Sequence, residues 1–97
     1  MQVKTHLLAF EENKIRMVDI PDNEPPSLES VFYFGQNDFQ PKQMPSLSVG
    51  DVIEMWSELY LVMPFGFKKI TPSEFESYKA IPREDRSMKI YKMEEAT

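Results

Sequence analysis

The chain has 97 residues, of which 41% are hydrophobic and 28% charged, with a formal net charge of −5 and no cysteine. This length supports one small domain over residues 1–97 and is too short for two hydrophobic cores. The lack of cysteine excludes disulfides, thiol nucleophiles and cysteine-ligated structural zinc. The apolar run at residues 7–10 is too short for a signal peptide or a membrane span, so we expect a cytoplasmic protein with no membrane partner.

The charge distribution also argues against one class of partner. The 16 acidic and 11 basic side chains are interspersed along the chain. A nucleic-acid-binding protein concentrates positive charge on one face, because phosphate contacts dominate its affinity. The sequence therefore disfavours duplex DNA as a partner.

The chain opens with two segments of strand character, residues 3–10 and 15–20. Polar residues join them, and Asn13 tolerates the left-handed conformation that tight turns need, so the pair predicts a hairpin. Three prolines lie within residues 21–26, which cannot continue a strand because proline lacks the N–H donor. We expect a connecting loop there.

A short helix is predicted after this loop. Ser27 stands at the N-cap position, Glu29 complements the helix dipole, and Gly35 is a plausible stop. The apolar residues of this segment are Leu28, Val31, Phe32 and Phe34.

Residues 46–70 form the most apolar part of the chain. Two runs, 52–56 and 59–63, are rich in β-branched and aromatic residues and are separated by Ser57 and Glu58. This pattern predicts a central hairpin, although the break lacks the Asn-Gly or Asp-Gly of the commonest tight turns. Residues 67–70 predict a further short strand.

The clearest local signal follows this strand. Thr71 can cap a helix, Pro72 fits its first position, and Glu74 completes a capping box. This helix should end before Pro82, because the residue preceding a proline disfavours helical geometry. Residues 83–97 combine apolar alternation with a high charge density, which permits either an edge strand or a mobile tail.

These elements predict an α+β fold. We expect a small, mostly antiparallel sheet, built from the N-terminal and central hairpins, with the two short helices packed on one face. A partly open β-barrel is the alternative.

The central region resembles small phage and mobile-element proteins of the YodL-like group over about residues 27–70. The resemblance rests on an S-x-S-V-G-D-V-I entry into a strand and on a Gly-Phe pair. The resemblance gives a hint about the fold and implies a phage or mobile-element origin, and the group has no established enzymatic activity. The residues that carry it are Leu28, Val31, Phe32, Ser46, Ser48, Val49, Gly50, Asp51, Val52, Ile53, Tyr60, Gly66 and Phe67.

No residue pattern predicts catalysis, a metal site or a cofactor. His6 is the only histidine and lacks a triad context, so we interpret it as a strand residue satisfied by solvent or a neighbour. Ser46, Ser48 and Asp51 are interpreted as closing a turn, with Gly50 supplying a permissive dihedral angle. We therefore expect a protein that is not an enzyme.

The aromatic residues suggest an interaction surface instead. Consecutive helical residues spread about 100° apart, so Tyr33 or Phe34 should face away from the core. Together with Trp56 and Tyr60 they form the predicted protein-interaction site of a non-catalytic module with an unidentified protein partner. Homo-oligomerisation is left open. The alternative function is single-strand nucleic-acid binding through aromatics interleaved with lysines. The alternative site comprises Phe65, Phe67, Lys68 and Lys69.

Overall fold

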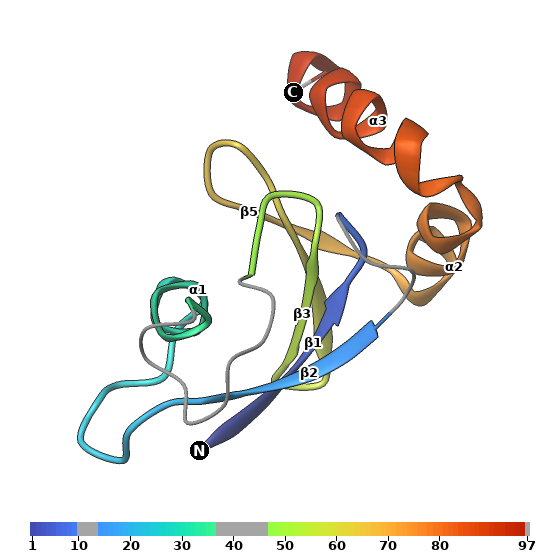
Figure 1. Cartoon of the computed structure of the whole chain (residues 1–97). Helices are drawn as coiled ribbons and strands as arrows, with labels where there is room; N and C mark the ends of the chain where they lie inside the picture. The colour runs from blue at the N-terminus through green and yellow to red at the C-terminus, as the bar shows by residue number, and fades with distance from the viewer. Residues whose placement is uncertain (10–13, 37–46, 97) are drawn as a thin grey trace.

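The computed structural model describes residues 1–9, 14–36 and 47–96. Five antiparallel strands form one sheet in the order β2-β1-β3-β4-β5, accompanied by three helices (Figure 1). The predicted α+β class is confirmed, and the sheet is not closed into a barrel, because β2 and β5 lie at its two edges. The elements are β1 (Gln2–Leu7), β2 (Lys14–Asp19), α1 (Leu28–Phe34), β3 (Val52–Met55), β4 (Glu58–Val62), β5 (Phe67–Ile70), α2 (Pro72–Ala80) and α3 (Arg83–Ala96).

The central strands are apolar on both faces of the sheet. Successive residues of a strand point to opposite faces, and Val52 and Ile53 are consecutive and fully buried. Leu61 and Val62 repeat this on β4. An antiparallel sheet with one wet face would show alternation instead. Both faces of this sheet must therefore be covered.

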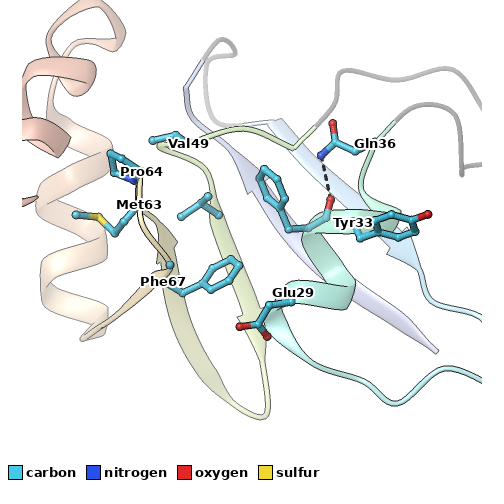
Figure 2. A pocket seen from close by; sticks show the side chains of 10 residues that line it. Glu29, Tyr33, Gln36, Val49, Met63, Pro64 and Phe67 are labelled. Carbon is cyan, nitrogen blue, oxygen red and sulfur yellow. Dashed lines mark hydrogen bonds between the residues drawn. The ribbon is translucent and has the colours of Figure 1, made fainter.

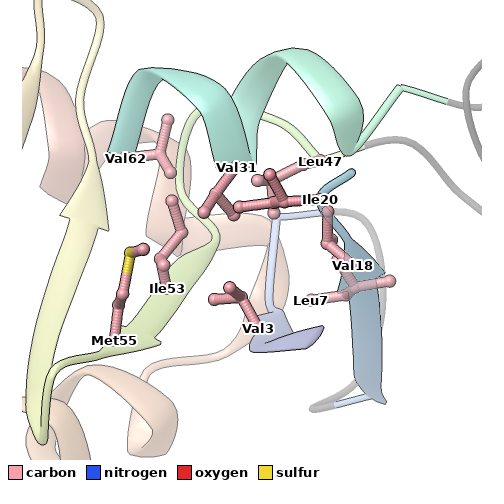
Figure 3. Close-up of a cluster of buried hydrophobic side chains, with 9 residues drawn as sticks. All are labelled: Val3, Leu7, Val18, Ile20, Val31, Leu47, Ile53, Met55 and Val62. Carbon is pink, nitrogen blue, oxygen red and sulfur yellow. The ribbon is translucent and has the colours of Figure 1, made fainter. Parts of the chain in front are cut away.

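Helices cover the sheet from both sides (Figure 1). We call the two sides the α1 face and the α2 face, because α1 packs on one and α2 with α3 on the other. The prediction that both short helices lie on one face is wrong, since it overlooked the second apolar face of β3 and β4. The α1-face core comprises Val3, Leu7, Val18, Ile20, Val31, Leu47, Ile53, Met55 and Val62 (Figure 3). The α2-face core comprises Leu8, Val52, Leu61, Met63, Ile70, Phe75, Tyr78 and Ile90.

Both predicted helix starts are confirmed. The Ser27 hydroxyl accepts a hydrogen bond from the Ser30 N–H at 3.0 Å. At α2 the Glu74 N–H donates to Thr71 Oγ1 at 3.1 Å, and the Thr71 N–H donates to Glu74 Oε1 at 2.9 Å. These bonds satisfy amides that have no partner within the helix, and they hold the pKa of the Glu74 carboxyl below its usual value.

Residues 83–96 form α3, so the predicted edge strand is wrong and the tail interpretation is replaced by a helix. The segment is rich in Arg, Glu, Lys and Met, which are good helix formers, and it contains no Gly or Pro. Arg86 and Ile90 are four residues apart and both buried, whereas Met88 and Lys89 are exposed. This spacing places one stripe of the helix against the α2-face core. Because a charged residue occupies one of these two buried positions, the apolar residues alone do not show the helical period.

A buried carboxylate organises the start of β3. Asp51 Oδ1 accepts hydrogen bonds from the Leu8 N–H at 2.8 Å and the Ala9 N–H at 2.9 Å. Its Oδ2 accepts from the Ser48 N–H at 2.8 Å, which confirms the predicted turn closure for Ser48 and Asp51. Ser46 lies outside the described residues. Asp51 therefore joins the end of β1 to the loop before β3.

Gly50 makes this geometry possible. Its φ is +99°, a conformation that favours glycine. Its N–H donates to the Val62 carbonyl at 2.8 Å, while the Val62 N–H donates to the Asp51 carbonyl at 2.9 Å. Gly50 and Asp51 therefore both lie opposite Val62, which makes this a β-bulge with glycine in its first position. The bulge turns the Asp51 carboxylate toward the end of β1.

Helices α2 and α3 close the same junction. Arg86 Nη1 donates to the Leu8 carbonyl at 2.7 Å, and its Nη2 donates to the Lys79 carbonyl at 3.0 Å. The Tyr78 hydroxyl donates to the Gly50 carbonyl at 2.5 Å. Burial raises the pKa of Tyr78 from 10.0 to about 12, with Arg86 acting to lower it and Asp51 to raise it. The backbone N–H and C=O of Leu8 are therefore both bonded to charged side chains.

A second buried arginine ties β2 to α1. Arg16 is 2% exposed, and its Nη1 donates to the Gly35 carbonyl at 2.6 Å. This cation lies at the C-terminal end of α1, where the helix dipole favours positive charge. Burial lowers the pKa of Arg16 from its usual value. The bond fixes the end of α1 over the β2 side of the sheet.

We predict that Ile53→Ala and Leu61→Ala each lower the free energy of unfolding by about 2–5 kcal/mol, the usual range for buried aliphatic truncations. Both side chains are fully buried, one on each face of the sheet. Urea unfolding monitored by circular dichroism measures the change. Unaltered midpoints for both variants would contradict the two-faced core.

Asp51→Asn should lower the free energy of unfolding by about 2–4 kcal/mol, because the amide weakens charge-assisted bonds and turns an N–H toward a backbone donor. The matched control is Glu76→Gln, which removes an acidic charge from an exposed helical position. The control should change stability by no more than about 0.5 kcal/mol. Equal stabilities of the two variants in urea titrations would rule out this role for Asp51.

The buried Tyr78 hydroxyl should make the stability of the protein depend on pH. Since its pKa is higher in the folded protein, its contribution to stability is present below pH 10 and is lost as the pH rises toward 12. Over this window wild type should lose about 3 kcal/mol relative to Tyr78→Phe. Urea unfolding of both proteins across this range measures the difference. A difference that stays constant with pH would show that the hydroxyl does not titrate from a buried site.

Candidate functional site: a groove beside helix α1

Helix α1 is too narrow to cover its face of the sheet. A helix with its side chains is about 10 Å across, whereas five strands span about 19 Å from the first to the last. The most extensive contacts of α1 are with β2 and β3, and Arg16 of β2 holds the end of the helix. The β4–β5 side of the α1 face is therefore left without a helix.

A groove of about 530 Å³ lies in this gap (Figure 2). Helix α1 forms one wall, and the end of β4, the following turn and β5 form the other. The Phe67 side chain points from β5 toward the helix (Figure 2). The apolar and aromatic side chains of the groove include Phe32, Tyr33, Val62, Met63, Pro64 and Phe67.

Few polar groups line the groove. Among its described lining residues, Glu29 carries the only charge. Gln36 closes one end, where its Nε2 donates to the Phe32 carbonyl at 2.9 Å and to the Leu47 carbonyl at 3.2 Å (Figure 2). A mostly apolar groove with few polar groups is typical of binding sites for apolar groups.

Two exposed aromatic side chains flank the groove. Tyr33 is 55% exposed, and its ring packs edge-on against Phe34 with ring centroids 5.0 Å apart. Phe65 is 85% exposed and lies between Pro64 and Gly66, two lining residues. Exposed aromatics beside an apolar groove mark interaction surfaces more often than active sites.

Trp56 lies at the tip of the central hairpin. The turn is Trp56-Ser57, one residue earlier than the sequence predicted, because Met55 pairs with Glu58. Both turn residues have positive φ, +55° and +63°, and the tryptophan is 56% exposed. A bulky residue in this conformation is strained by about 1–2 kcal/mol. The hairpin therefore holds its indole in solvent at a cost in stability.

The four residues predicted for protein interaction separate into two groups. Tyr33 and Trp56 are exposed, as the helical geometry and the strand end indicated. Phe34 and Tyr60 are partly buried and pack against the α1-face core. Tyr33 alone of the four lines the groove among the described residues.

The alternative nucleic-acid residues do not share one surface. Phe67 and Lys69 project from β5 on the α1 face, whereas Lys68 projects on the α2 face, because neighbouring strand residues alternate. Lys69 Nζ lies 3.3 Å from Glu58 Oε2. The two lysines therefore cannot form one continuous basic track with the aromatics.

The described residues contain no group of three or more His, Cys, Asp or Glu that could hold a metal ion. His6 Nε2 lies 3.1 Å from Glu54 Oε1, and its ring packs edge-on against Phe75 at 4.8 Å. This arrangement agrees with the interpretation of His6 as a strand histidine satisfied by neighbours. Within the described ranges, no helix has the length and apolarity needed to cross a membrane.

Comparisons with protein-family models, with curated proteins and with solved structures give no match. The resemblance to YodL-like domains therefore stays a prediction.

Sequence reasoning missed the groove as a whole. Its lining comes from three separate stretches, residues 29–36, Val49 and residues 62–67, and no local pattern links them. One signal was available in Pro64-Phe65-Gly66, where an aromatic residue stands in the middle of a turn. Phe65 belongs instead to the predicted alternative nucleic-acid site.

Proposed function

We propose that this protein is a non-catalytic interaction module that binds another protein through the groove beside α1. The observation that carries the proposal is a mostly apolar groove of about 530 Å³ flanked by Tyr33 and Phe65, exposed at 55% and 85%. The groove is large enough to take several side chains of a partner.

The physical reason for a protein partner is desolvation. Transfer of an exposed aromatic ring into an apolar interface contributes about 25 cal/mol per Å² of buried apolar area, before the entropic costs of association. Tyrosine, tryptophan and phenylalanine are enriched at protein interfaces for this reason. The net charge of −5 disfavours nucleic acid as the main partner.

Trp56 supports the same proposal from another position. The two-residue hairpin needs positive φ at both turn residues, which explains the conformation of Trp56 but not the choice of a strained and exposed aromatic residue there. Strain that persists at an exposed residue is a reason to infer function there. We assign Trp56 to a second contact at the hairpin tip. A phage or mobile-element origin, implied by the YodL-like resemblance, belongs to the same proposal.

Tyr33→Ala and Trp56→Ala should each leave the melting temperature within a few degrees of wild type, because exposed positions contribute little to stability. Each should weaken capture of the partner at least about tenfold, as loss of a hot-spot aromatic does. The measurement is affinity capture with a tagged chain from cells of its source, quantified by mass spectrometry.

The matched control is Met88→Ala. Met88 is 64% exposed on α3, on the other side of the sheet from the groove. A protein that binds the groove should be captured by wild type and by Met88→Ala, but not by Tyr33→Ala. If every captured protein binds Tyr33→Ala as well as it binds wild type, the groove is not the interaction site.

A further inference from the structure

Among the described residues, β5 forms the edge of the sheet beside the groove. Strand β5 is last in the sheet order, and no described strand pairs with its second edge. An unpaired edge presents backbone N–H and C=O groups that can bind an additional strand. Phe67 belongs both to this edge and to the groove.

The hydrogen-bond pattern identifies which backbone groups point outward. Val62 bonds to Gly50 and Asp51 through both its N–H and its carbonyl, so it faces β3. The next residue, Met63, faces β5, and its N–H donates to the Gly66 carbonyl at 3.0 Å.

The same alternation continues along β5. Lys68 pairs with Leu61 and therefore faces β4, as Ile70 does. The N–H and C=O groups of Phe67 and Lys69 then point away from the sheet. These two residues offer two donors and two acceptors to a strand laid against the edge.

The side chains of the same two residues define what such a strand should carry. Phe67 and Lys69 both project on the α1 face, where Phe67 lines the groove. Residues directly opposite each other in an antiparallel pair share a face and lie about 5 Å apart. The residue opposite Phe67 would therefore enter the apolar groove, and the residue opposite Lys69 would meet an ammonium group.

Charge decides between a second copy and a different chain. Suppose that two copies of the chain pair through β5 in an antiparallel, two-fold arrangement with three residues overlapping. Lys68 then lies opposite Lys68 of the other copy, or Lys69 lies opposite Lys69. Like charges in direct opposition destabilise strand pairing. An acidic residue opposite Lys69 is favourable, because the Lys69 side chain is 62% exposed and its ammonium has three donors, only one of which is needed for Glu58. The net charge of −5 opposes this weakly, since exposed charges beyond about 8 Å are screened at physiological salt.

We propose that the edge of β5 binds an extended segment of the partner protein as a sixth, antiparallel strand. The segment reads acidic-x-apolar from its N-terminus, with the acidic residue opposite Lys69 and the apolar residue opposite Phe67 in the groove. The proposal rests on the proposed function and specifies its binding mode. The other edge, β2, does not border the groove and has no part in it.

The test begins with a phage-displayed library of random nine-residue peptides selected on the immobilised full chain. Enriched peptides should share the acidic-x-apolar spacing. Synthetic copies with a fluorescent label are then titrated by anisotropy against wild type, Lys69→Glu and Lys68→Glu. Lys69→Glu should raise Kd at least about tenfold, because an attractive cross-strand pair becomes repulsive.

Lys68→Glu is the matched control. It makes the same change in net charge one residue away, on the opposite face of the same strand, so Kd should rise less than about threefold. A chemical control uses the peptide backbone. N-methylation of the acidic or the apolar residue should abolish binding, whereas N-methylation of the residue between them should have little effect, because its N–H points away from β5.

Three outcomes would overturn the proposal: no peptide is enriched, the enriched peptides lack this spacing, or Lys68→Glu and Lys69→Glu weaken binding equally. Peptides that lose binding to Tyr33→Ala but tolerate N-methylation at every position would leave the groove as the interaction site and remove strand addition. If capture of every partner is instead independent of Tyr33, the proposed function itself is wrong. The two failures are therefore distinguishable.

Discussion

The backbone of Leu8 is held between two buried charged side chains, and the arrangement of the other elements depends on it. Its N–H donates to the Asp51 carboxylate at 2.8 Å, and its carbonyl accepts from the Arg86 guanidinium at 2.7 Å. A buried peptide group without partners is costly, and removing one partner of a buried charge is costlier still. The end of β1, the start of β3 and α3 are therefore fixed together, although they are far apart in sequence.

The same junction reaches the groove through residues 47–51. The glycine bulge at Gly50 sets the path of this segment, which places Leu47 in the α1-face core and Val49 at the groove. Arg16 meanwhile anchors the C-terminal end of α1 through the Gly35 carbonyl. With the helix fixed toward β2, the β4–β5 side of the sheet stays uncovered. The groove is thus a consequence of how the core is covered.

Three features of the surface meet beside the groove and point to one kind of partner. The groove takes apolar side chains, the exposed rings of Tyr33 and Phe65 add contact area, and the β5 edge offers backbone hydrogen bonds. Backbone pairing gives affinity with little dependence on sequence, while the groove and Lys69 supply selectivity. The lysines of β5 also disfavour edge pairing between copies.

The sequence by itself determined much of the local structure of this protein and part of its candidate site, but not helix α3 or the exact turn of the central hairpin. The cap of α1, the capping box at Thr71 and the apolar runs of the central strands depend on neighbours within a few residues, so their patterns are visible in the chain. Helical geometry likewise indicated that Tyr33 or Phe34 faces solvent. Tertiary structure alone decided which helix covers each face of the sheet, that Arg86 is buried against Leu8, and that three separate stretches of the chain form a groove. The consecutive apolar residues of β3 and β4 indicate that both faces are covered, but the choice of covering element depends on contacts between residues up to 78 positions apart.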